Sequence, residues 1–359
     1  MRLLLAGGGT GGHLFPAVAL AEQLRMEDPE SEILFVGTDR GLEYRMLPEL
    51  GWSLRTVDMS GFAGLGLAAR GKALVKLAGS FMQSRQILKE FKPDVVVGVG
   101  SYASVPVLLA ANSLRLPTVI HEQNAWPGLA NRCLGRWARR ICLSFAAADR
   151  AFHHGATTLT GNPVRKAMEA CPDITFEKPC LLVFGGSHGS RAINQALIAA
   201  TPLLNGWRDR LRIVHQTGEQ DYEEVSQAYA DQGWPDRNVE SFIRDMASTY
   251  AAATLVVCRA GATTLAELTA CGRPAILIPY PHAAGGHQSS NARALAAKGA
   301  ALMFEEKDLV PAQLASVIND LLQDRTTLQR MASTAKSMTR SGAAARILAE
   351  CRAVISEVT

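Results

Sequence analysis

Short runs of apolar residues alternate with longer amphipathic segments along the first half of the chain. Val95, Val96 and Val97 follow one another without polar alternation, as in a parallel strand covered on both faces. The apolar runs predict strands over residues 2–6, 32–36, 94–99, 118–122 and 140–143, and the longer segments predict helices over 14–25, 72–90, 102–114 and 127–139.

The same pattern restarts in the second half, after a cluster of Gly and Pro residues between Gly161 and Pro179. Strands are expected over residues 180–184, 212–216, 255–258, 275–278 and 301–304, and helices over 191–200, 220–230, 263–271 and 288–298. Strands that alternate with helices predict parallel α/β sheets, here in two domains that join at the Gly/Pro cluster. The stretch from Asp308 to Thr359 has only a helical pattern, so it caps a sheet or crosses back to the first domain.

Composition narrows the class of protein. The 359 residues suit two domains. Hydrophobic residues make up 48% and charged residues 19%. The charged share is below the roughly 25% of soluble domains. A chain with this much apolar and this little charged residue content is not intrinsically disordered. No apolar run reaches 18 residues, so no membrane-spanning helix is expected. The seven cysteines lack a Cys-x-x-Cys spacing and predict free thiols in a reducing, cytoplasmic compartment.

A glycine-rich loop, residues 7–12, separates the first predicted strand from the first helix. Glycines allow an anion to approach backbone N–H groups at a helix N-terminus. Gly7, Gly9 and Gly12 also fit the G-x-G-x-x-G pattern of dinucleotide sites. Such a site has an acid at the end of the second strand, where this chain has Gly37, with Asp39 as a late substitute. A nicotinamide or flavin site is therefore the less favoured alternative.

Two more glycine turns follow predicted strands, one at residues 185–189 and one at 98–101. Three such loops at the carboxyl ends of strands in two similar halves predict phosphate-bearing ligands in a cleft between them. None of the loops has the lysine of a Walker motif, so phosphoryl transfer is not expected.

Several polar residues follow predicted strands or begin helices. Residues 121–124 (His-Glu-Gln-Asn) end one strand, Arg259 ends another, and Glu267 lies one turn into the next helix. Residues 121–124 are either a solvated loop or ligand-binding groups. Glu267 is either a carboxylate that stabilises the helix dipole or an acceptor for ribose hydroxyls. His13, in the first turn of its helix, is a packing residue or a general base, because histidine titrates near neutrality. The spacing of His, Cys and acidic residues predicts no metal site.

A basic, apolar stretch covers residues 70–92, where Glu90 is the only acid. It is an ordinary amphipathic helix, or a surface helix that binds anionic lipid together with the apolar loop 61–67. The aromatic content of 6% and the lack of a nucleic-acid motif argue against nucleic acid as the partner. The residues expected at the membrane are Lys72, Leu74, Val75, Lys76, Leu77, Phe81 and Arg85.

Five sets of residues, in order along nearly the whole chain, resemble one family. They are 8–16, 121–124, 161–165, 185–187 with Asn194, and 258–261 with Glu267. It is the family of peptidoglycan N-acetylglucosaminyltransferases that convert lipid I to lipid II. The resemblance implies the GT-B glycosyltransferase fold, with two Rossmann-like domains whose parallel sheets face a cleft. It implies an acceptor- and membrane-binding domain over 1–163, a UDP-GlcNAc domain over 164–340, and a final helix over 341–359 that packs back on the first domain.

The resemblance also implies residue roles. Ser187 meets the pyrophosphate, the Ile243 backbone reads the uracil, Glu267 binds the ribose and Gln288 binds the sugar. The full donor set is Thr10, Gly11, Gly12, Asn124, Arg165, Ser187, Ile243, Arg259, Ala262, Thr263, Thr264, Leu265, Ala266, Glu267 and Gln288. The acceptor set is Gly8, Gly9, Gly100, Ser101 and Tyr102. His13 is the candidate base, with Glu122 as the second candidate.

The implied reaction is attack of the 4-hydroxyl of MurNAc in lipid I on the anomeric carbon of UDP-GlcNAc, with inversion to a β-1,4 linkage. It needs no cofactor or metal. The implied partners are both substrates, the anionic membrane at the cytoplasmic face, and proteins of cell-wall synthesis and division, with no nucleic acid. One departure is His287 before Gln288, where the family often has two glutamines, so position 287 has no assigned role. A nicotinamide oxidoreductase and a non-catalytic lipid-binding scaffold are the rival functions.

Overall fold

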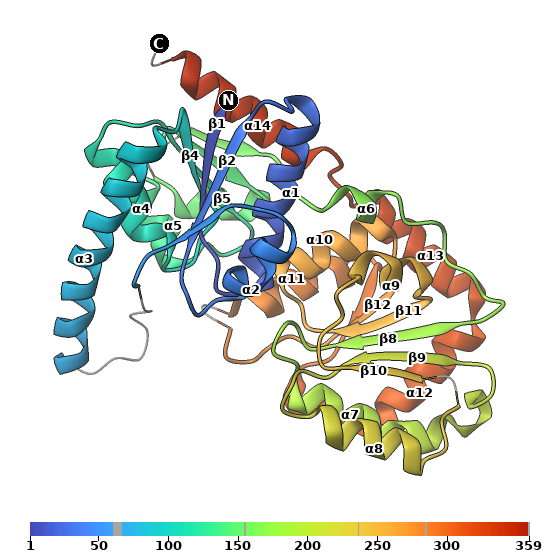
Figure 1. The fold of residues 1–359 in the computed structure, drawn as a ribbon. Helices are drawn as coiled ribbons and strands as arrows, with labels where there is room; N and C mark the ends of the chain where they lie inside the picture. Colours follow the sequence, from blue (N-terminus) through green and yellow to red (C-terminus); the bar gives the residue numbers. More distant parts are fainter. Residues whose placement is uncertain (60–66, 154–155, 236, 284–285, 358–359) are drawn as a thin grey trace. The chain divides into compact units, whose positions relative to one another are not determined.

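The computed structural model describes residues 1–59, 67–153, 156–235, 237–283 and 286–357, without the side chains of 67–74. The chain forms two compact units (Figure 1). Unit 1 comprises Met1–Arg165 and Arg340–Thr359, and unit 2 comprises Lys166–Thr339. No helix of the described residues is long and apolar enough to span a membrane.

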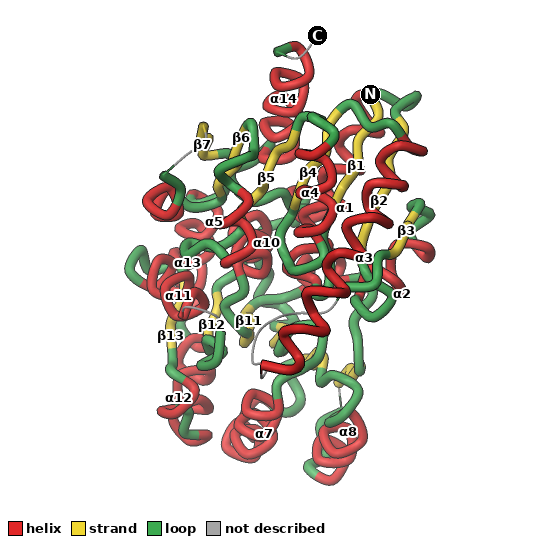
Figure 2. Tube along the Cα trace, turned by 90° about the vertical axis from the view of Figure 1, so that its left-hand side faces the viewer, coloured by secondary structure: helices red, strands yellow, loops and turns green. Residues whose placement is uncertain are grey.

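Unit 1 is built on one seven-stranded sheet in which every pair of neighbours is parallel. Its strands are β1 (Arg2–Ala6), β2 (Glu32–Gly37), β3 (Leu54–Thr56), β4 (Val95–Gly98), β5 (Thr118–Glu122), β6 (Arg140–Leu143) and β7 (Ala156–Leu159). Figure 2 shows them side by side in the order β3-β2-β1-β4-β5-β6-β7. The five predicted strands are confirmed, and the short edge strands β3 and β7 are additional.

Helices cover both faces of this sheet. They are α1 (Gly11–Glu27), α2 (Leu42–Glu49), α3 (Leu67–Phe91), α4 (Ser104–Ser113), α5 (Leu129–Leu134), the 3-10 turn η1 (Ala146–Ala151) and α14 (Ala343–Ser356). Leu3 and Leu5 of β1 share a core with α1 and α14, and Leu4 and Ala6 share a core with α3 and α4. The alternating side chains of one strand therefore fill two cores, as expected for a sheet covered on both faces.

The last helix belongs to unit 1 although most of the chain separates it from the sheet. Ile347, Leu348, Cys351 and Val354 of α14 are fully buried. Arg140 of β6 bonds Glu350 at 3.2 Å and also pairs with Glu357. Burial of one apolar face with ion pairs at its edge fixes α14 against the sheet.

Unit 2 has a six-stranded, wholly parallel sheet in the order β10-β9-β8-β11-β12-β13. The strands are β8 (Cys180–Phe184), β9 (Arg212–Gln216), β10 (Arg237–Glu240), β11 (Leu255–Cys258), β12 (Ala275–Leu277) and β13 (Ala301–Met303). The helices are α6 (Lys166–Glu169), α7 (Arg191–Ala200), α8 (Tyr222–Asp231), α9 (Met246–Ala252), α10 (Ala262–Cys271), α11 (His287–Ala296), α12 (Pro311–Gln323) and α13 (Arg325–Ser337), with 3-10 turns η2 (Thr201–Trp207) and η4 (Glu306–Asp308).

One core of unit 2 joins β8 to helices α7, α8 and α12. Leu181 and Val183 of β8 are fully buried there, beside Leu197 and Leu314. The predicted α/β class with two parallel sheets is confirmed. Edge strand β10 and helix α9 were not predicted, because both are short and carry mixed polar and apolar residues.

The packing of α14 generates a prediction about stability. Replacing the fully buried Leu348 by Ala removes apolar contacts and leaves a cavity, so the free energy of unfolding of unit 1 is expected to fall by about 2–5 kcal/mol. Urea unfolding measures the change. Met26→Ala, at a side chain that is 52% exposed, is the control, and an equal effect of both substitutions would contradict this account.

Candidate active site

The glycine loop between β1 and α1 is held by a buried carboxylate of the chain itself. Glu43, on α2, is 0% exposed. Its Oε2 accepts a hydrogen bond from Gly9 N at 2.6 Å, and its Oε1 accepts from Thr38 N at 2.9 Å and Thr38 Oγ1 at 3.0 Å. A carboxylate with three donors is a charge-assisted anchor. It ties the loop to the end of β2.

Glycines make room for this carboxylate. A Cβ at Gly37 would lie 2.6 Å from Glu43 Cγ, and a Cβ at Gly8 or Gly41 would overlap the carboxyl group. The G-x-G-x-x-G pattern predicts a ribose-binding acid at position 37 or 39, and the glycine loop predicts amides that bind an external anion. Glu43 was not predicted, because glycines at 37 and 41 followed by an acid do not by themselves indicate a contact with Gly9, 34 residues earlier. The Gly9 amide is already bound inside the chain.

His13 lies in the first turn of α1, and its ring contacts the loop after β4. Its Nδ1 is 2.9 Å from the Val99 carbonyl oxygen. A carbonyl only accepts, so Nδ1 carries the proton and Nε2 of the neutral ring has a lone pair. A Cβ at Gly100 (φ +92°) would lie 3.0 Å from the His13 Cε1 and Nδ1 atoms. Gly100 therefore gives this ring its space.

The other predicted acceptor residues lie in the same loop or next to it. Ser101 has a φ of +67°, and its Oγ accepts from Ala103 N at 3.2 Å. Tyr102 is half-buried against the α3 and α4 core. Gly8 and Gly9 lie in the Glu43-anchored loop. The structure thus brings the predicted acceptor residues and His13 to the carboxyl ends of β1 and β4.

Glu122 is a loop-positioning residue by its contacts. It is 1% exposed. Its Oε1 accepts from Asn124 N at 2.8 Å and Asn124 Nδ2 at 3.1 Å, and its Oε2 accepts from Gly128 N at 3.2 Å and Asn131 Nδ2 at 2.8 Å. Four donors occupy both oxygens. This geometry favours a role in holding Asn124 over the role of second candidate base.

The remaining predicted donor residues of unit 1 lie around the start of α1. Thr10 precedes the helix, and its carbonyl accepts from His13 N at 3.2 Å. Gly11 and Gly12 form the first turn, and a Cβ at Gly11 would lie 2.9 Å from the Phe15 ring. Arg165 is the last residue of the first segment of unit 1, and its guanidinium stacks over the Phe15 ring at 4.6 Å.

In unit 2, the second glycine loop runs from β8 to α7 and packs against the loop after β9. Gln216 Nε2 donates to the Gly186 carbonyl at 2.8 Å. Gln216 Oε1 accepts from Ile243 N at 2.8 Å, so that N–H already has a partner. Ser187 Oγ lies 3.2 Å from His188 Nδ1. Gln216, which the sequence did not single out, thus links Ser187's loop to the Ile243 segment.

Arg259 connects the segment before α7 to the segment that follows β12. Its guanidinium donates to Ser190 Oγ at 2.6 Å and to the carbonyls of Ile278 and Pro279 at 3.2 and 3.1 Å. It also pairs with Glu306. Ser190 in turn caps α7, with Ile193 N donating to its Oγ at 3.4 Å. Arg259 therefore fixes the start of α7 beside the second glycine loop.

The predicted ribose and sugar residues lie on α10 and α11. Glu267 is 6% exposed, and Tyr250 OH donates to its Oε2 at 3.4 Å. Gln288 Oε1 accepts from Ala260 N at 3.2 Å and Tyr280 N at 2.9 Å. The first turns of α10 hold the remaining predicted donor residues Ala262, Thr263, Thr264, Leu265 and Ala266.

Asn194, one of the residues that carries the resemblance, holds the turn after β9. Its Nδ2 donates to the Thr217 carbonyl at 3.0 Å and to Asp221 Oδ2 at 2.8 Å. Its Oδ1 lies 3.0 Å from His215 Nε2, and Tyr229 OH lies 3.0 Å from His215 Nδ1. Complete burial lowers the pKa of His215 to about 3. His215 is therefore neutral near pH 7 and acts as a structural bridge.

The predicted membrane residues lie on α3. Val75 is 74% exposed, and Met82, two helical turns further along α3, is 62% exposed. Lys76 Nζ bonds Asp58 Oδ1 at 2.8 Å, and Arg85 is half-buried. Leu77 and Phe81 pack against the core of unit 1. The side chains of Lys72 and Leu74, and residues 61–66 of the apolar loop, lie outside the part of the chain that the structure describes.

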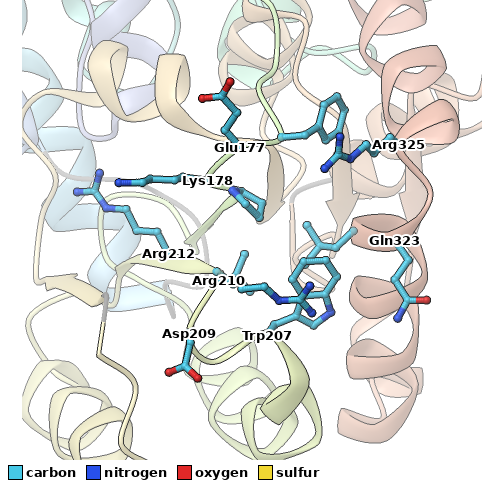
Figure 3. A pocket seen from close by; sticks show the side chains of 12 residues that line it. Glu177, Lys178, Trp207, Asp209, Arg210, Arg212, Gln323 and Arg325 are labelled. Atoms are coloured by element: carbon cyan, nitrogen blue, oxygen red, sulfur yellow. The ribbon is translucent and has the colours of Figure 1, made fainter.

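A cavity of about 810 Å³ opens elsewhere in unit 2, at the amino ends of β8 and β9. Figure 3 shows Lys178 and Arg212 extending to one side of it and Arg210 lying against Trp207. The candidate loops leave the opposite, carboxyl ends of the same strands. The cavity is therefore separate from the residues described above.

Comparison with known proteins defines the class first. Residues 3–143 match the glycosyltransferase family 28 N-terminal domain, and residues 180–347 match the glycosyltransferase family 28 C-terminal domain. Together with two parallel-sheet units whose glycine loops leave the carboxyl ends of strands, these matches define a glycosyltransferase with the GT-B fold.

Full-length relatives identify the family. The chain is 59% identical over 357 residues to the UDP-N-acetylglucosamine–N-acetylmuramyl-(pentapeptide) pyrophosphoryl-undecaprenol N-acetylglucosamine transferase of Syntrophotalea carbinolica, covering 99% of this chain and 100% of the relative. It is 47% identical to the Syntrophus aciditrophicus transferase of the same name, with 99% of both chains covered. The crystal structure of Acinetobacter baumannii MurG matches with a TM-score of 0.74 and 31% identity, covering 98% of this chain and 99% of that one. The chain belongs to the MurG family of N-acetylglucosamine transferases, and the resemblance in its motifs is confirmed.

The internal anchor of the first glycine loop generates a prediction. In the wild type, the two Glu43 oxygens accept from Gly9 N and Thr38 N. In Glu43→Gln, an NH₂ group replaces one of these oxygens and faces a donor. An unsatisfied buried donor costs about 1–3 kcal/mol, so the free energy of unfolding of unit 1 is expected to fall by that amount. Urea unfolding measures it, with Glu30→Gln at an exposed glutamate as the matched control. Equal stability of the two variants would refute the anchor.

Proposed function

We propose how this chain performs the reaction to which its full-length identity with the family's transferases points. It transfers N-acetylglucosamine from UDP-N-acetylglucosamine to the N-acetylmuramyl sugar of undecaprenyl-pyrophosphoryl-MurNAc-pentapeptide, lipid I, and so forms lipid II and UDP. The 59% identity that extends over the whole length of both chains carries this proposal. The site residues give it a mechanism.

His13 is the general base in this proposal. Its Nδ1 proton is committed to the Val99 carbonyl at 2.9 Å, which leaves the Nε2 lone pair to take the proton of the attacking 4-hydroxyl. The hydroxyl oxygen bonds to the anomeric carbon as the bond to UDP breaks. One displacement inverts the α-linked donor to a β-1,4 product. Among the described residues, His13 Nε2 has no hydrogen-bond partner, which supports this assignment.

Unit 2 binds the donor in this proposal. Glu267 accepts hydrogen bonds from the ribose hydroxyls. Gln288 binds the sugar through Nε2, because its Oε1 already accepts from two backbone N–H groups. The Ile243 carbonyl binds the uracil, because the Ile243 N–H already donates to Gln216. The departing diphosphate gains negative charge at the second glycine loop. Loop amides, Ser187 and the N-terminus of α7 are groups that stabilise such charge.

Two donor residues act indirectly in this scheme. Arg259 is bound to Ser190, two carbonyls and Glu306, so it supplies positive potential and rigidity to the second loop. Asn124 is positioned by Glu122. Thr10, Gly11 and Gly12 contribute the N-terminus of α1, and the loop of Gly100, Ser101 and Tyr102 receives the acceptor next to His13.

The membrane contact belongs to the same proposal. Lipid I carries an undecaprenyl chain, so an enzyme that uses it works at a bilayer surface. Val75 and Met82 are exposed apolar groups on α3, and Lys76 and Arg85 lie on the same helix. We place the enzyme peripherally at the cytoplasmic face of the cell membrane, with proteins of cell-wall synthesis and division as further partners.

A UDP-release assay with UDP-GlcNAc and a lipid I analogue tests the base. The wild type is expected to release UDP only when both substrates are present. His13→Ala is expected to lower kcat by about 10²–10⁴-fold, the usual contribution of general-base catalysis, while the KM for UDP-GlcNAc stays within about twofold because unit 2 is unchanged.

Two outcomes of this assay would count against the proposal. Near-normal turnover of His13→Ala would remove His13 as the base. Release of UDP from other nucleotide sugars at the same rate, or none from UDP-GlcNAc, would remove the reaction. Glu122→Gln is the companion variant for the second candidate. Because its amide NH₂ would face the donors of either Asn124 or Asn131, its free energy of unfolding is measured together with its turnover.

Vesicle binding tests the membrane surface. Charge reversal of Lys72, Lys76 and Arg85 is expected to weaken binding to vesicles with anionic lipid by at least about tenfold, because each basic residue near such a surface contributes about 1 kcal/mol. Sedimentation with vesicles measures it. Lys298→Glu, at an exposed lysine of unit 2, is the control, and unchanged binding of the triple variant would exclude this surface.

A further inference from the structure

A line of hydrogen bonds connects His13 to a second, buried histidine. Gln123 Nε2 donates to the Val99 carbonyl at 2.8 Å, the same oxygen that accepts from His13 Nδ1 at 2.9 Å. Gln123 Nε2 also lies 3.1 Å from His121 Nδ1. Gln123 is 2% exposed and His121 is 1% exposed. The motif at 121–124 therefore reaches the His13 ring through one backbone carbonyl.

The chemistry of the partners fixes the direction of each bond. His121 Nε2 faces the Gly161 carbonyl at 3.3 Å and Ser144 Oγ at 3.2 Å. Because a carbonyl only accepts, Nε2 carries the proton and Nδ1 accepts. Burial lowers the pKa of His121 to about 4, so this ring is neutral near pH 7. The Gln123 amide must therefore present its NH₂ group to both His121 and Val99.

This orientation has a cost that the two donor bonds offset. Gln123 Oε1 is buried and has no hydrogen-bond partner in the described part of the chain. The reversed amide would place Oε1 against the Val99 carbonyl oxygen and leave His121 Nδ1 without a donor. A buried unsatisfied group in a native structure calls for a reason. Control of the Val99 carbonyl is that reason here.

We propose that Gln123 is a positioning residue for the transfer reaction: it holds the Val99 carbonyl so that His13 stays in the Nδ1–H tautomer with Nε2 available as the base. This inference rests on the proposed role of His13. Gln123 acts through the Val99 carbonyl, the acceptor that it shares with His13 Nδ1. Gly100 completes the arrangement, because any Cβ at that position would press on the same ring.

Four titratable groups belong to this line of bonds or to the loops next to it: His13, His121, Glu122 and Glu43. His121 is part of it, and its charge interacts with that of His13. The Glu122 carboxylate, next to it on β5, is held by Asn124 and Asn131. The Glu43 carboxylate holds the loop that precedes α1. A carboxylate introduced at position 123 would add negative charge beside both imidazole rings and favour their protonated forms.

The test uses two substitutions of Gln123 in the full chain. Gln123→Met keeps the length of the side chain and removes its donors, and kcat is expected to fall by about ten- to a hundredfold, as for other small misplacements of reacting groups. The KM values for both substrates are expected to stay unchanged. Gln123→Glu is expected to shift the acidic limb of the kcat–pH profile to higher pH, because its charge favours protonated imidazole. Its kcat is expected to stay below the wild-type value on the alkaline side, because an ionised carboxylate cannot donate to the Val99 carbonyl. The matched control is Gln232→Met in unit 2, where an amide that donates to the Ile198 carbonyl at 3.0 Å is lost.

The ¹⁵N NMR signals of His13 give a readout that does not depend on turnover. The wild type is expected to show the Nδ1–H tautomer, and Gln123→Met a mixture of tautomers. An unchanged tautomer in Gln123→Met overturns the inference, whether kcat falls or not, since Gln123 would then act by another route. If His13→Ala keeps its turnover, the base assignment fails separately, and the tautomer alone decides the role of Gln123.

Discussion

Every strand of both sheets runs in the same direction as its neighbours, and the rest of the site depends on this constraint. Parallel strands bring all their carboxyl ends to one edge of a sheet, where open α/β sheets bind ligands. The loops after β1, β4 and β5 therefore meet in unit 1, and those after β8, β9 and β11 meet in unit 2. Residues far apart in sequence, such as His13 and Gln123, are neighbours for this reason.

Gathering loops at one edge does not fix their shape, and buried polar side chains do that here. Glu43 holds the first glycine loop, Glu122 holds the loop of Asn124, Gln216 and Arg259 hold the second glycine loop, and Gln123 holds the Val99 carbonyl. Each makes two or more hydrogen bonds, and at least one of them joins it to another element or loop. Fixed donors and acceptors of this kind reduce the reorganisation that a reaction requires.

The central strands could be predicted from the sequence because they are apolar on both faces. The bounds of β1, β5, β8 and β11 agree to the residue. Edge strands β3, β7 and β10 were missed, because they are short and carry mixed polar and apolar residues. The edge strand β13 (Ala301–Met303) is wholly apolar and was predicted over residues 301–304. Glu43 was missed for another reason: its partner Gly9 lies 34 residues earlier, and no local pattern shows that glycines 8, 37 and 41 surround one carboxylate.

The place of α14 has a consequence for how the chain folds during synthesis. Leu3 and Leu5 of the first strand share a core with α1 and with Ile347 and Leu348 of α14, so the part of this sheet face that α14 covers stays open until α14 has left the ribosome. Unit 2 contains all of its own elements and is released earlier as a complete segment. The first half of the protein to be made is thus the last to be finished, and its exposed apolar face is the part of the nascent chain that needs protection longest.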